Sequence, residues 1–74
     1  MSWRQINEEV RRCRALPTAE ARIECLKQLL ARRHDGMVAF ALGEELWACG
    51  NLREALRYFE MAERLFPLDQ IVRV

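Results

Sequence analysis

The stretch that decides the fold is Leu42 to Pro67, which reads LGEELWACGNLREALRYFEMAERLFP. Apolar residues recur at helical spacing on both sides of a single glycine, Gly50. Glycine readily adopts the left-handed conformation that ends a helix, so Gly50 predicts a turn between two helices. Pro67 lacks an amide hydrogen and cannot continue the second helix. This stretch therefore predicts a helical hairpin.

Small side chains in this stretch show where the two helices approach each other. Gly43 lies on the first helix, and Ala55 and Ala62 lie on the second. The distance between packed helices depends on the side chains at the contact, so small residues allow the closest approach. We expect larger apolar side chains to fill the space around these sites, namely Leu42, Leu46 and Phe59.

This pattern resembles the tetratricopeptide repeat, whose consensus runs W-x2-L-G-x2-Y, then A-x3-F, then P. The positions that match are Leu42, Gly43, Ala55, Phe59 and Pro67. Ala39 stands where the family usually has Trp, and Leu46 stands where it usually has Tyr. The resemblance implies antiparallel helix-turn-helix repeats that stack into a short right-handed α-solenoid and bind other proteins.

The first half of the chain repeats the second at a shift of 36 residues. Trp3, Ile6 and Val10 correspond to Ala39, Leu42 and Leu46, and Ala19, Ile23 and Leu26 correspond to Ala55, Phe59 and Ala62. The first repeat, residues 1–36, is the weaker match, because Asn7 and Arg14 occupy glycine positions of the family. Residues 37–70 form the second repeat, and residues 71–74 are an apolar tail. We expect an all-α fold of four helices, near residues 3–13, 18–33, 36–49 and 52–66.

Length, charge and cysteine content limit the function classes. Seventy-four residues allow one small domain, and a net charge of +1 is too balanced for a dedicated nucleic-acid binder. No apolar run approaches the roughly 20 residues of a membrane-spanning helix. The three cysteines, Cys13, Cys25 and Cys49, are odd in number and widely spaced. They predict free thiols in a reducing cytoplasm rather than a disulfide framework.

The sequence gives no indication of enzymatic activity. The three cysteines and His34 lack the paired spacing of a zinc site, so we expect no metal. No glycine-rich phosphate loop or nucleophile–base constellation is present, so neither cofactor nor catalytic residue is predicted.

The residues expected to bind a partner follow from the family resemblance. Tetratricopeptide arrays generally bind partners on a concave surface made by the first helix of each repeat. The corresponding positions are Met37, Phe40, Glu44 and Trp47 in the second repeat and Arg4, Glu8 and Arg11 in the first. Phe40 and Trp47 favour an apolar groove for a helix or peptide of another protein, or for a second copy in a dimer.

Other interpretations are compatible with the same residues. The apolar row could pack within its own chain, or the chain could be a small secretion-type chaperone that covers an aggregation-prone helix. A module of another class would bind RNA through its arginine clusters and the neighbouring histidine, at Arg11, Arg12, Arg14, Arg32, Arg33 and His34. Interleaved acidic residues favour a solvated, ion-paired face instead. A repeat fragment, excised or designed, with only a structural role is the last alternative.

Overall fold

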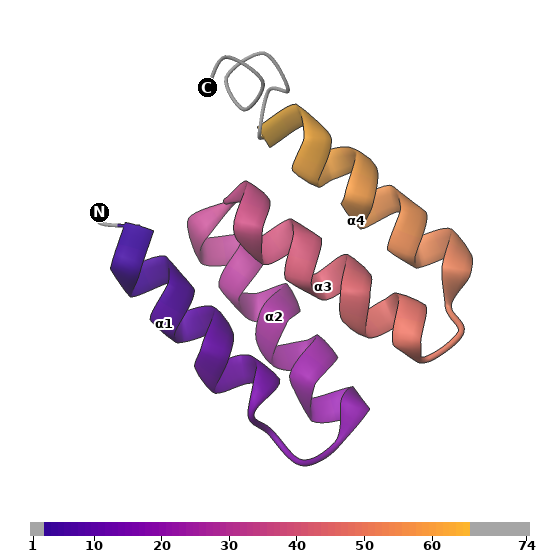
Figure 1. Cartoon of the computed structure of the whole chain (residues 1–74), viewed down its shortest axis with the longest axis horizontal. Coiled ribbons are helices and arrows are strands. Elements are labelled where there is room, and N and C mark those ends of the chain that lie inside the picture. The colour runs from indigo at the N-terminus through magenta and orange to yellow at the C-terminus, as the bar shows by residue number, and fades with distance from the viewer. Residues whose placement is uncertain (1–2, 66–74) are drawn as a thin grey trace.

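The computed structural model describes residues 3–65, apart from the side chain of Trp3. This part of the chain forms four α-helices and no strand: α1 (Trp3–Arg14), α2 (Ala19–Arg33), α3 (Gly36–Ala48) and α4 (Leu52–Leu65). The chain reverses direction at each connection, so that α3 lies beside α4 and α1 beside α2 (Figure 1). The all-α prediction is confirmed. Phe66, Pro67 and the predicted tail at residues 71–74 lie outside the described residues.

Local capping explains why α2 and α3 begin where they do. The hydroxyl of Thr18 accepts a hydrogen bond from the amide of Ala21, and the carboxylate of Asp35 accepts one from the amide of Met37. Both satisfy helix amides that have no partner within the helix. Between the two helices His34 has a positive φ of 41° and donates its amide to the Leu30 carbonyl. His34 thus ends α2 directly after Arg33, where the second helix was expected to end.

The core is centred on α3, which packs against each of the other three helices. Its apolar side chains are buried on more than one side, as expected for a helix that is apolar around much of its circumference. The largest fully buried side chains come from α2 and α3: Leu26, Leu29, Val38, Leu42 and Leu46.

The close approach predicted between α3 and α4 is confirmed. Ala55 and Ala62 are buried, and a Cβ atom added to Gly43 would lie 2.7 Å from two carbons of the Phe59 ring. Gly50, with a φ of 86°, provides the left-handed turn. Leu56 shares the helical spacing of the apolar residues on α4 but does not point into the core, because 54% of this residue is exposed.

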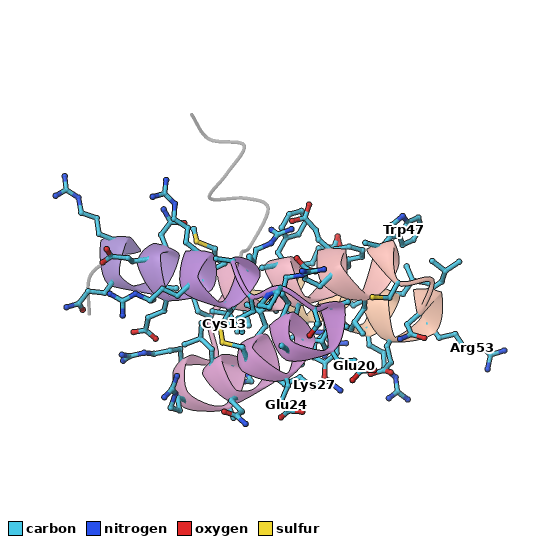
Figure 2. The ribbon with its side chains drawn as sticks, turned by 90° about the horizontal axis from the view of Figure 1, so that it is seen from below. Cys13, Glu20, Glu24, Lys27, Trp47 and Arg53 are labelled. Atoms are coloured by element: carbon cyan, nitrogen blue, oxygen red, sulfur yellow. A yellow bond between two sulfur atoms is a disulfide. The ribbon has the colours of Figure 1, made fainter. Side chains whose placement is uncertain are left out.

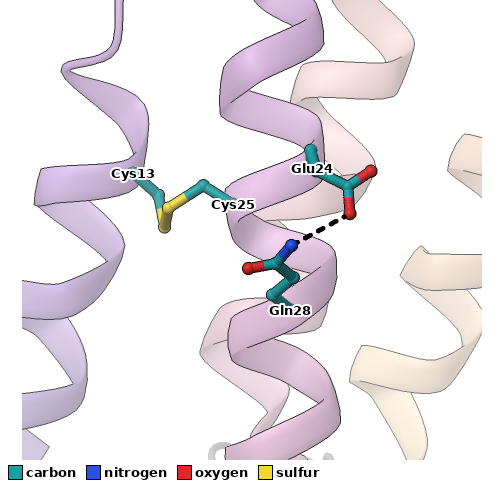
Figure 3. The surroundings of a disulfide bond; sticks show 4 residues. All are labelled: Cys13, Glu24, Cys25 and Gln28. Atoms are coloured by element: carbon teal, nitrogen blue, oxygen red, sulfur yellow. Dashed lines mark hydrogen bonds between the residues drawn. A yellow bond between two sulfur atoms is a disulfide. The ribbon is translucent and has the colours of Figure 1, made fainter.

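A disulfide between Cys13 and Cys25 fastens α1 to α2, with the two Cα atoms 5.4 Å apart (Figure 3). This corrects the expectation of free thiols. The cysteines are far apart in sequence, but the reversal between α1 and α2 brings the buried side of α1 against α2. Cys49 is the free and exposed thiol among the described residues. No helix in this part of the chain is both long and apolar enough to cross a membrane.

Candidate protein-binding surface

The predicted row on α3 is at the surface. Phe40 is 48% exposed and Trp47 is 54% exposed, which is unusual for such large apolar side chains. Met37 and Glu44 are half-buried. The four residues are separated by three, four and three positions, a spacing that places them along one side of a helix. Figure 2 shows Trp47 on the side of the molecule opposite Glu24 and Lys27 of α2.

The ring of Phe59 on α4 packs against the rings of both Phe40 and Trp47. Its ring centroid lies 5.5 Å from that of Phe40 and 6.3 Å from that of Trp47, with tilted planes in both pairs. These are favourable distances and orientations for aromatic pairs. Beside them is a shallow hollow of about 290 Å³ lined by Glu44, Trp47 and Phe59. The exposed ring of Trp47 therefore lies at the edge of this hollow, and Phe40 packs on the other ring that lines it, Phe59.

Two residues of this surface were missed in the sequence. Leu52 is 48% exposed and Leu56 is 54% exposed, and both lie on α4 at helical spacing from Phe59. Their helical spacing was visible in the sequence, but apolar residues at this spacing usually face the core, so they were not assigned to the surface. We define the apolar patch as the four exposed large apolar side chains of α3 and α4: Phe40 and Trp47, which pack on Phe59, and Leu52 and Leu56, which lie on the same helix as Phe59.

An ion-pair network joins three helices next to this patch. Glu45 of α3 is buried and accepts hydrogen bonds from the Nε atoms of Arg14 on α1 and Arg22 on α2, at 3.1 and 2.9 Å. Nη1 of Arg14 also donates to the carboxylate of Glu44 at 2.9 Å, and Nη1 of Arg22 donates to the Leu16 carbonyl. Partial burial lowers the pKa of Arg14, but the two carboxylates outweigh it and raise the pKa overall.

We expect Glu45→Gln to lower the free energy of unfolding by about 1.5 kcal/mol, because hydrogen bonds to charged groups contribute about 1.5 to 3 kcal/mol and the amide keeps part of them. Both arginines remain partly exposed, which limits the loss. Urea unfolding measures the difference. Glu44→Gln is the matched control, since its more exposed pair should contribute less than about 1 kcal/mol. Equal losses in the two variants would contradict a special role for Glu45.

The predicted residues of α1 do not join this network. Arg4, Glu8 and Arg11 are all exposed, and within residues 3–65 no hydrogen bond or ion pair connects them to α3. Arg14 makes the connection between α1 and the α3 row instead. This pairing depends on how the helices pack, so the spacing of charges along the sequence did not indicate it.

The arginine clusters are partly neutralised. Arg14 pairs with two carboxylates, and Nη2 of Arg33 donates to Glu9 at 3.0 Å. The described residues contain no group of histidine, cysteine and acidic side chains that could hold a metal ion.

No protein-family model matches the chain, and no curated protein or solved structure matches it either. The resemblance to the tetratricopeptide repeat therefore stays a prediction from the sequence.

Proposed function

We propose that this chain is a protein-binding module of the tetratricopeptide type, which binds a helix or peptide, or a second copy of itself, through the apolar patch. The observation that carries the proposal is the exposure of Phe40 and Trp47, whose rings pack on the half-buried Phe59, together with the exposure of Leu52 and Leu56 on the same helix as Phe59. Exposed apolar patches mark interaction sites in proteins that are otherwise well packed.

The arrangement suits helix-in-groove recognition. Apolar side chains of a partner helix would enter the hollow beside Trp47 and Phe59, and the supported rings would act as anchors. Because Phe59 already holds both rings in place, little side-chain entropy is lost on binding. The exposed Arg14–Glu44 pair lies at the edge and would orient the partner.

A small secretion-type chaperone would use the same patch in the same way and differs only in its partner. Two of the five clustered arginines, Arg14 and Arg33, are engaged with carboxylates, which weakens the case for RNA binding. A cytoplasmic location remains part of the proposal. Disulfides in that compartment are usually transient and redox-active, so this location requires a Cys13–Cys25 bond that opens and closes.

Replacing both Phe40 and Trp47 by alanine should abolish association and leave the helical fold intact. Each truncation of an aromatic anchor costs about 2 kcal/mol or more of binding free energy. Light scattering over a wide concentration range measures the self-association of parent and variant. If the parent is a monomer throughout, a synthetic amphipathic helix with leucine on one face is titrated instead.

Circular dichroism at the same concentrations separates binding from folding. The matched control is Glu20→Gln with Glu24→Gln, two exposed positions on the opposite side of the molecule (Figure 2). Loss of helical signal in the alanine variant would mean that Phe40 and Trp47 stabilise the fold of the single chain rather than an interface. A monomeric parent that also fails to bind the leucine-faced helix would overturn the proposal.

A further inference from the structure

A second hollow is lined by residues of α1 and α2 and lies against the disulfide. Its volume is about 370 Å³, and its lining combines sulfur with charge: Cys13, Cys25, Leu29, Glu9, Arg12, Arg32 and Arg33. Cys13 is buried, whereas Cys25 is only half-buried. The disulfide is therefore accessible from this hollow, at Cys25 first.

The charges around the hollow do not balance. Three arginines face one carboxylate, that of Glu9, which is paired with Nη2 of Arg33. Within the described residues Arg12 and Arg32 make no ion pair or hydrogen bond. The Nε atom of Arg33 is buried and has no acceptor. A buried donor without a partner is costly, so the hollow as it stands has a deficit of negatively charged acceptors.

We propose that this hollow is a thiol–disulfide exchange site for a small thiol that carries carboxylates, of the glutathione class. The carboxylates bind Arg12 and Arg32, and an oxygen can supply the acceptor that Arg33 lacks. This places the sulfur of the thiol against the half-buried Cys25. A neutral thiol of the same size would gain none of these contacts.

The reaction proceeds by two exchanges. The thiolate attacks Sγ of Cys25, a bond forms between the two sulfurs, and the Cys13–Cys25 bond breaks with its electron pair on Sγ of Cys13. Nearby arginines stabilise the leaving thiolate, which then takes up a proton from water. The thiolate of a second small thiol then attacks the sulfur of the first one, which is bound to Cys25. The two small thiols leave joined as their disulfide, and Cys25 is left as a thiolate that takes up a proton. The sum is two thiols oxidised and one protein disulfide reduced to two thiols.

The first test compares rates of reduction by glutathione and by 2-mercaptoethanol. In a Cys49→Ser background, Arg12→Gln with Arg32→Gln should slow glutathione about tenfold, since electrostatic attraction raises association rates by about that factor or more. The rate with 2-mercaptoethanol should fall several-fold less, because this thiol has no carboxylate and loses only the attraction of its single thiolate charge and the stabilisation of the leaving thiolate. Arg53→Gln with Arg57→Gln, both exposed on α4, is the charge-matched control and should change neither rate. An equal fall with both thiols, or no fall with either, would overturn the proposal.

The second test uses Cys49 as an internal standard. In Cys13→Ser, Cys25 and Cys49 are both free, and the variant is exposed to oxidised glutathione or to the neutral disulfide of 2-mercaptoethanol. Mass spectrometry of peptides then locates the mixed disulfide. We expect glutathione on Cys25 first, and the neutral group on Cys49 first, because Cys49 is exposed whereas Cys25 is half-buried. The same order with both reagents would contradict recognition of the carboxylates. If circular dichroism shows this variant unfolded, the rate comparison decides alone.

Discussion

Removing the Cys13–Cys25 disulfide is expected to lower the free energy of unfolding by about 3 kcal/mol, the value that loop-closure entropy gives for a bridge across roughly 12 to 15 residues. The two cysteines are 12 positions apart. The bond acts mainly by lowering the conformational entropy of the unfolded chain, because it keeps residues 13 and 25 together. A loss of this size is a large part of the 5 to 15 kcal/mol that typically stabilises a domain, so the reduced chain should be only marginally folded.

Urea unfolding of Cys13→Ala with Cys25→Ala against the parent measures this loss, and addition of a reductant to the parent should reproduce it. Cys49→Ala is the control, since this exposed thiol has no partner and its replacement should change the stability by less than about 0.5 kcal/mol. A double variant as stable as the parent would show that packing alone holds α1 in place.

Gly43→Val should cost about 2 kcal/mol of stability. Even a Cβ atom at this position would be 2.7 Å from the Phe59 ring, so the extra methyl groups force the ring and α4 to move. Overpacking of this kind costs about 1 to 3 kcal/mol, and the higher helix propensity of valine offsets less than about 0.5 kcal/mol. Because Phe40 and Trp47 rest on the same ring, the apolar patch should be distorted as well.

A double-mutant cycle with Phe59→Leu isolates this contact. A smaller side chain at position 59 leaves room for valine, so the combined variant should lose less stability than the two single losses added together. Coupling between residues in contact typically amounts to about 0.5 to 3 kcal/mol. Strict additivity would mean that the ring does not limit what fits at position 43.

The α3–α4 hairpin was predictable in detail because its determinants are local. Gly50 specifies the turn, and the small residues that let the helices meet are visible in the repeat pattern. The disulfide was not predictable in this way, since an odd number of cysteines without recognisable spacing gives no indication of which two face each other. Only the packing of α1 against α2 brings Cys13 to Cys25.

The candidate surface was predicted in part for a similar reason. Phe40 and Trp47 follow from the spacing on α3, and their exposure agrees with the expected groove. Leu52 and Leu56 were missed because periodicity identifies an apolar face without showing whether another helix covers it. The Arg14–Glu45 bond joins residues 31 positions apart and depends on how α1 crosses α3.

The packing order of the helices has a consequence for how fast the chain folds. The principal contacts join helices that follow one another in the sequence, with α1 against α3 as the one longer step among them. Chains dominated by such local contacts typically fold within microseconds to milliseconds. Disulfide formation takes seconds to hours. The helices therefore assemble first and bring the two sulfurs together. The disulfide then forms within a chain that is already folded and stabilises that fold.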